Sequence, residues 1–68
     1  MSKADEFVNK IVEATDNGDW KKAVAAWNEM TKEFLENDNS ELILEVYSGV
    51  ASYGINMGQV LERAMDDK

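Results

Sequence analysis

The large apolar residues of one stretch recur at the spacing of a helix, and this periodicity limits the possible folds more than any other feature. Residues three and four positions apart lie on one face of an α-helix. Asp19 stands directly before the stretch and is a favourable N-cap. The pattern predicts an amphipathic helix over residues 19–36. Its large apolar residues are Trp20, Val24, Trp27, Met30 and Phe34.

Three other segments carry apolar residues at helical spacing, and clusters of Gly, Asn and Asp separate all four segments. Because the chain contains no proline, these clusters are its only punctuation. We expect the further helices at residues 4–15, 39–53 and 57–65. The segment 39–53 is rich in β-branched residues, which would suit a strand, but its length and spacing favour a helix. Asp38, followed by Glu41, resembles a capping box at its start.

Four short helices with brief connections imply antiparallel neighbours. The predicted fold class is all-α: a small antiparallel bundle of three to four short helices, arranged as two helical hairpins in a single domain over residues 1–68. A chain of 68 residues buries only about 60% of the surface that its unfolded form exposes. Neither hairpin can be stable alone, so we expect their apolar faces to pack on each other.

The chain contains neither cysteine nor histidine. This composition excludes disulfides and thiolate metal sites, and it removes the commonest general base. The N-terminal residues lack the apolar core of a signal peptide. No run approaches the roughly 20 apolar residues that span a bilayer. The predicted location is therefore the cytoplasm, without membrane contact.

Several acidic residues lie at helical neighbour spacing, as Glu29 and Glu33 do, and paired carboxylates can perform acid–base chemistry. That chemistry needs a pocket that shifts a pKa, and nothing in the sequence indicates one, so a solvated helix face explains the pair better. The turns at residues 16–19 and 36–41 are rich in Asp and Asn but do not match a calcium-binding EF-hand loop. We expect no catalytic residue, no metal and no cofactor, and thus a protein that is not an enzyme.

Fourteen acidic residues face seven basic ones, which gives a net charge of −7. This charge repels nucleic acids and anionic membranes. No lysine or arginine occurs from Glu33 through Glu62. We expect an acidic surface around the end of the second helix and the start of the third, attracting a basic partner protein; an incidental solubilising surface is the alternative. The candidate partner-binding residues are Glu29, Glu33, Glu36, Asp38, Glu41 and Glu45.

Small residues in the third segment would allow another helix to approach closely. Internal packing against the second helix explains them, and a self-association seam is the alternative. Trp20 and Trp27 could serve as exposed anchors for a partner, but their spacing with Val24 favours the core. The candidate residues for a homodimer are Tyr47, Gly49 and Tyr53.

The piece NGDWKKAVAAWNEM contains a Gly-Asp-aromatic turn at Gly18, Asp19 and Trp20. Ala23 stands where two helices would touch, and Trp27 stands at the following large apolar position. With these features, the first half of the chain resembles a tetratricopeptide-type helical hairpin. Glycine permits the tight turn and alanine permits the close approach of the helices. The resemblance implies protein-partner binding and not chemistry.

The resemblance covers only Ala4 to Asn37 and departs from the family pattern at several points. Lys10 and Ile11 stand where the family has leucine and then a small residue, and the closing proline is missing. The second half of the chain keeps only a similar length and a turn with glycine. Fewer than three repeats cannot build the concave groove of the family.

These observations favour a small acidic interaction module or inhibitor that presents an acidic helical surface to a basic partner protein. One alternative is a phage-type DNA mimic, in which carboxylates imitate phosphates and occupy the nucleic-acid-binding site of another protein. Seven net charges on 68 residues is modest for such mimicry. A second alternative is a structural subunit that folds only in an assembly. Salt separates the first two, because a mimic loses its partner steeply as salt rises.

Overall fold

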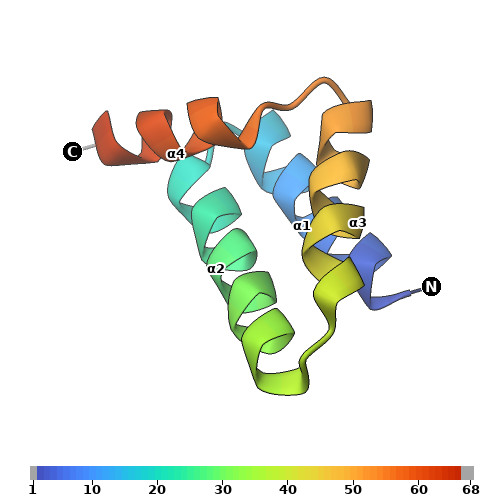
Figure 1. Cartoon of the computed structure of the whole chain (residues 1–68). Helices are drawn as coiled ribbons and strands as arrows, with labels where there is room; N and C mark the ends of the chain where they lie inside the picture. Colours follow the sequence, from blue (N-terminus) through green and yellow to red (C-terminus); the bar gives the residue numbers. More distant parts are fainter. Residues whose placement is uncertain (1, 67–68) are drawn as a thin grey trace.

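The structure of the protein is a computed structural model that describes residues 2–66, apart from the side chain of Ser40. Within these residues the chain forms only helices and no strand (Figure 1). The predicted all-α class and small bundle are confirmed, including a helix at the segment rich in β-branched residues. Each helix begins and ends within one residue of its predicted range. The helices are α1 (Lys3–Asp16), α2 (Trp20–Asn37), α3 (Ser40–Ser52) and α4 (Met57–Asp66).

Polar side chains cap the starts of three helices. Ser2 Oγ accepts a hydrogen bond from the backbone N–H three residues later, at 3.2 Å. The Asp19 carboxylate does the same at the start of α2, at 3.2 Å. Asn56 Oδ1 accepts from the N–H groups of Gly58 and Gln59, at 2.8 and 3.3 Å. Each cap satisfies backbone donors that the first turn of a helix leaves without a partner.

The start of α3 differs from the expected capping box. Asp38 adopts the left-handed conformation, with φ 50°, and caps the C-terminus of α2 by donating its N–H to the carbonyl of Phe34. Asn39 is the N-cap of α3, and its side chain makes no capping hydrogen bond. The chain reverses direction between α2 and α3 in two residues. Asp38 therefore ends one helix and does not cap the next.

α1 and α2 pack against each other as a helical hairpin (Figure 1). Gly18 turns the chain with φ 71°, a conformation that glycine adopts without the steric penalty of a Cβ atom. The backbone N–H of Asp19 donates to the carbonyl of Ala14 at 2.8 Å and closes the turn. Ala14, Ala23 and Ala26 are buried. Their small side chains let the two helices approach closely.

α3 packs mainly on α1 and to a lesser extent on α2. The contact with α1 is so close that a Cβ atom added at Gly49 would lie 2.6 Å from Cγ2 of Val8. Among the small residues of α3, Gly49 thus serves internal packing, whereas Ser48, Ala51 and Ser52 are exposed. The sequence had suggested packing against the second helix, but the neighbour of Gly49 is the first. On its other buried side, α3 contributes Val46 and Val50 to the core.

α4 lies across the N-terminal end of α2 and makes few contacts with α3 (Figure 1). Met57 and Val60 bury their side chains beneath it. The guanidinium of Arg63 lies over the ring of Trp20, 5.0 Å from the ring centroid. This cation–π contact ties the last helix to the first turn of α2. The second half of the chain therefore packs on the first hairpin more than on itself.

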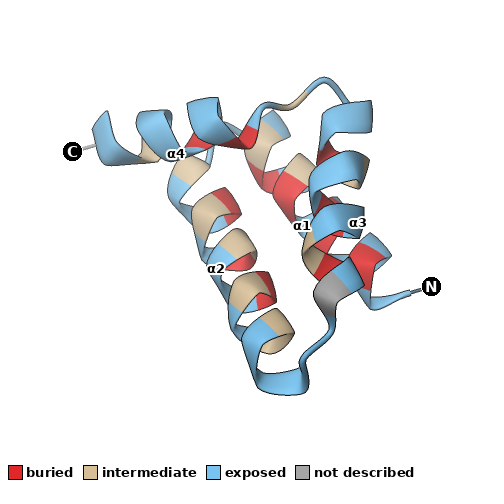
Figure 2. Cartoon of the chain, viewed as in Figure 1, coloured by how far each residue is buried: buried red, intermediate tan, exposed pale blue. Residues whose placement is uncertain are grey.

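One apolar core joins the four helices, and the described residues contribute no buried polar or charged side chain to it. Buried positions lie on the inward faces of α1, α2 and α3 (Figure 2). Trp20 and Trp27, expected in the core, are only half-buried and pack against its edge. The buried residues are Ala4, Phe7, Val8, Ile11, Ala14, Ala23, Ala26, Met30, Leu42, Val46, Val50, Met57 and Val60.

Replacing Gly49 with alanine should lower the free energy of unfolding by about 1 kcal/mol. The clash with Val8 costs about 2 kcal/mol. The higher helix propensity of alanine relative to glycine offsets only about half of that cost. Urea unfolding followed by far-UV circular dichroism measures the change. The double variant Val8→Ala/Gly49→Ala should lose less free energy of unfolding than the two single variants lose in sum. The close approach would be contradicted if Gly49→Ala raised the free energy of unfolding and the losses of the single variants simply added.

Replacing Asp19 with alanine should lower the free energy of unfolding by about 1 kcal/mol, because the first turn of α2 loses its cap. The matched control is Asp16→Ala, which removes the same charge from the end of α1 and should change the stability by less than about 0.5 kcal/mol. The same unfolding experiment compares the two variants. Equal losses would mean that the charge matters and the capping bond does not.

Candidate functional site

The outward face of α3 exposes large apolar side chains. Leu44 is 67% exposed, Tyr47 is 56% exposed, and Tyr53, the C-cap of this helix, is 61% exposed. Single exposed apolar residues are common on protein surfaces, whereas several on one helix mark a surface that can bind. Other exposed large apolar residues are Leu35 on α2 and Leu61 and Met65 on α4. With its C-cap, α3 carries three of these residues, more than any other helix, and this makes it the candidate site.

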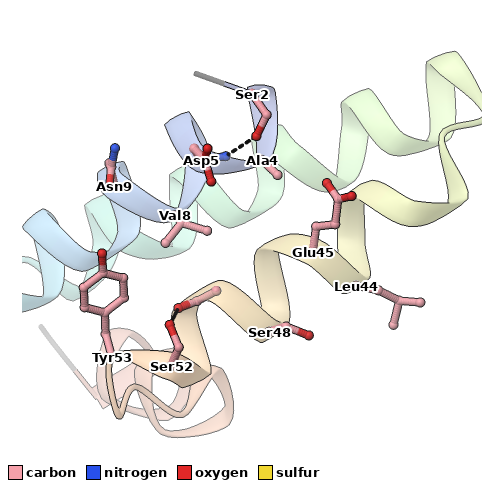
Figure 3. Close-up of a pocket in the computed structure, with 11 residues that line it drawn as sticks. Ser2, Ala4, Asp5, Val8, Asn9, Leu44, Glu45, Ser48, Ser52 and Tyr53 are labelled. Atoms are coloured by element: carbon pink, nitrogen blue, oxygen red, sulfur yellow. Dashed lines mark hydrogen bonds between the residues drawn. The ribbon is translucent and has the colours of Figure 1, made fainter.

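A groove runs between α1 and α3 beside this exposed face, with a volume of about 840 Å³ (Figure 3). From α1 it is lined by Ser2, Ala4, Asp5, Val8 and Asn9. From α3 and its C-cap it is lined by Leu44, Glu45, Ser48, Gly49, Ser52 and Tyr53. The lining therefore combines small residues, hydroxyl groups and apolar side chains with two carboxylates, and it contains no lysine or arginine.

Three of the six predicted partner-binding carboxylates have basic neighbours. Glu33 forms an ion pair with Lys3, which joins the end of α2 to the start of α1. The hydrogen bond and the charge of Glu33 raise the pKa of Lys3 above its usual 10.5.

The other two of these carboxylates lie along the same helix, α2. Glu36 lies 4.0 Å from the ammonium of Lys32, one helical turn earlier. Glu29 lines a separate pocket between α1 and α2, together with Lys10 and Lys22. Half of the predicted acidic surface is thus locally balanced by lysines.

The other three carboxylates, Asp38, Glu41 and Glu45, lie just before α3 and along it. All three are exposed, and the structure of residues 2–66 gives none of them an ion pair. Glu41 and Glu45 stand one helical turn apart, and Glu45 lines the groove. The structure therefore reduces the predicted acidic surface to α3 and the turn before it.

The three residues predicted for self-association do not share one surface. The ring of Tyr47 packs edge-on against Trp27 of α2, with 6.5 Å between ring centroids and 65° between ring planes. Gly49 is half-buried against Val8, and Tyr53 lies at one end of the groove. Tyr47 therefore points toward α2, while Gly49 and Tyr53 lie on the side of α1.

Sequence reasoning missed Leu44 and Asp5 as members of the site. Leu44 belongs to the run Leu42-Ile43-Leu44, and three consecutive residues of a helix cannot all face the core. That run was the available signal. Asp5 gave none, because only the packing of α1 on α3 brings it to the groove.

Within residues 2–66 no three acidic side chains come together in a way that could hold a metal ion. The serine hydroxyl of Ser52 donates to the carbonyl of Gly49 at 2.6 Å, so it satisfies the helix backbone. In this part of the chain, none of the helices is both long enough and apolar enough to cross a bilayer. The surface offers contact area and charge.

Comparisons with known proteins add no relative. No protein-family model, no curated protein and no solved structure matches the chain. The resemblance of residues 4–37 to a tetratricopeptide-type hairpin therefore stays a prediction. The candidate site accordingly depends on the geometry and charge of α3 and its groove.

Proposed function

We propose that the chain is a protein-binding module, or an inhibitor, that presents α3 to a basic partner protein. One observation carries this proposal: Leu44 and Tyr47 are more than half exposed on a helix whose carboxylates form no ion pair within residues 2–66. Exposed leucine and tyrosine side chains present apolar area to water. A partner that buries this area gains about 25 cal/mol of binding free energy for each Å². The carboxylates attract and orient that partner.

Charge favours a different protein over a second copy of this chain. Each copy carries −7, and a symmetric contact between two α3 helices would bring Glu41 and Glu45 of both copies together. Like charges facing each other at an interface are unfavourable. A basic surface would neutralise the same groups. The proposed partner is therefore a protein with exposed lysine or arginine beside apolar residues.

A DNA mimic is less well supported. A mimic needs a dense array of unpaired carboxylates, whereas Glu33 and Glu36 have lysine neighbours. Exposed Leu44 also does not fit a mimic, because a site that binds phosphates does not require an apolar contact. A purely structural subunit would be expected to expose more of its core. The chain needs no disulfide, which fits the cytoplasmic location that we propose for it.

Replacing Leu44 with serine should weaken binding to the partner by about tenfold, because the interface loses an apolar anchor worth about 1–2 kcal/mol. The partner is first captured on the wild-type protein and identified, and then titrated in purified form by isothermal calorimetry. Leu35→Ser is the matched control, since Leu35 is 72% exposed on α2. It should leave the dissociation constant within about twofold. Equal effects of the two variants would contradict α3 as the site.

Raising the salt concentration from about 50 to about 500 mM should slow association about tenfold while changing the dissociation rate less than about twofold. Surface plasmon resonance with the purified partner measures both rates. A mimic would behave differently, because its affinity would collapse and nucleic acid would displace it from the partner.

Neutralising the acidic residues around the turn between α2 and α3 also distinguishes a protein-binding module from a DNA mimic. The triple variant Glu36→Gln/Asp38→Asn/Glu41→Gln should slow association a few-fold and leave the complex intact, since exposed charges govern the rate more than the final affinity. The control Glu6→Gln/Asp16→Asn/Glu62→Gln removes the same charge elsewhere and should have a smaller effect. Complete loss of binding by the first triple variant alone would favour the mimic.

A further inference from the structure

The groove between α1 and α3 has a shape that favours one kind of occupant. Gly49, which has no side chain, lines it and lies against Val8. From α1, Ala4 adds only a short side chain (Figure 3). Ser48 and Ser52 add only short side chains on the wall of α3. Small residues allow the backbone of a bound segment to approach closely. Leu44 and Tyr53 stand at the margins and supply apolar contact area.

Backbone hydrogen bonding favours a helix over an extended peptide. Both walls of the groove are α-helices, whose central N–H and C=O groups already bond within the helix. The groove offers no strand edge to which an extended segment could add. An occupant must therefore satisfy its own backbone, as a helix does. The α3 wall covers residues 44–53, which corresponds to about 14 Å, or two to three turns of a bound helix.

The charges of the walls select a basic helix. Asp5 stands on α1 and Glu45 on α3, on opposite walls of the groove (Figure 3). No lysine or arginine lines it. A helix with lysine or arginine on its flanks would place a cation near each wall, and its apolar stripe would cover Leu44 and Tyr53. A second copy of this chain, at −7, would meet net repulsion here.

We infer that the groove between α1 and α3 holds a basic amphipathic helix of the partner protein. The apolar stripe of that helix packs on Leu44 and Tyr53, and its basic residues face Asp5 and Glu45. This inference rests on the proposed function and specifies its binding mode. It places the bound helix on the α1 side of α3, so Tyr47, which contacts Trp27 on the α2 side, is left for other parts of the partner.

The probe is a synthetic peptide of about 14 residues with leucines on one helical face and lysines on both flanks. Two matched peptides replace the lysines with glutamates or break the helix with a central proline. Titration into the full-length ¹⁵N-labelled protein should shift the amide signals of residues 2–9 and 44–53. Both matched peptides should bind at least about tenfold more weakly, as lost charge pairing and a lost helix require.

A charge swap separates recognition from general attraction between opposite charges. Asp5→Lys/Glu45→Lys should lose at least about tenfold affinity for the lysine peptide and gain affinity for the glutamate peptide. The control Asp16→Lys/Glu62→Lys makes the same change of net charge outside the groove and should not reverse the preference. Ser48→Trp fills the groove without altering charge and should also block binding. Circular dichroism confirms that each variant is folded.

Several results would overturn the inference. The inference is wrong if the lysine peptide does not bind, or if the amide shifts are confined to α2 and α4. It is also wrong if the two double variants have equal effects. Concentration-dependent shifts without peptide, together with a dimer in sedimentation, would assign the groove to a second copy. If the natural partner is weakened by Leu44→Ser but not by Ser48→Trp or the charge swap, the proposed function stands and the groove is not its site. If none of the three variants weakens it, both fall.

Discussion

The close approach of α3 to α1 at Gly49 and Val8 sets most of the surface of this protein. Without a side chain at Gly49, α3 lies near enough to α1 to bury Val46 and Val50 in the common core. Gly49 and Val8 line the groove at this contact, which also fixes which residues of α3 remain outside. A larger residue at this point would lift α3 from the bundle. The groove, the exposed Leu44 and the buried valines thus depend on one contact between two helices.

Charge is divided between the two halves of the chain, and packing makes that division sharper. The lysines of residues 2–66 lie on α1 and α2, where Lys3 pairs with Glu33 and Lys32 lies near Glu36. These contacts balance acidic residues locally. α3 has no basic residue, and within residues 2–66 neither Glu41 nor Glu45 forms an ion pair. Uncompensated carboxylates therefore share α3 with exposed Leu44 and Tyr47.

Half-buried aromatic residues hold the second half of the chain on the first. Trp27 meets Tyr47 edge-on between α2 and α3, and Trp20 meets Arg63 between α2 and α4. Both tryptophans lie on the apolar stripe of α2 but at the edge of the core, where a ring can bury one side and contact a polar or aromatic partner with the other. A 68-residue chain buries a small fraction of its surface, so these edge contacts add to a limited apolar core.

Patterns along the chain predicted the four helices, their limits to within one residue, and the all-α class, because apolar periodicity and the caps at Asp19 and Asn56 depend on neighbouring residues. They also predicted an acidic α3, since no basic residue occurs from Glu33 through Glu62. Local patterns do not state which helix packs on which. That α3 packs on α1 and that α4 crosses α2 became known from the three-dimensional packing.

The candidate site shows the same boundary between local and long-range information. Sequence spacing identified Glu41 and Glu45 but grouped them with Glu29 and Glu33, because it could not show which carboxylates meet a lysine from another helix. Asp5 joins Glu45 only through the packing of α1 on α3. Helix formation thus depends on residues three and four positions apart. The groove depends on residues some forty positions apart, whose distance is set by the small size of Gly49 and not by any pattern along the chain.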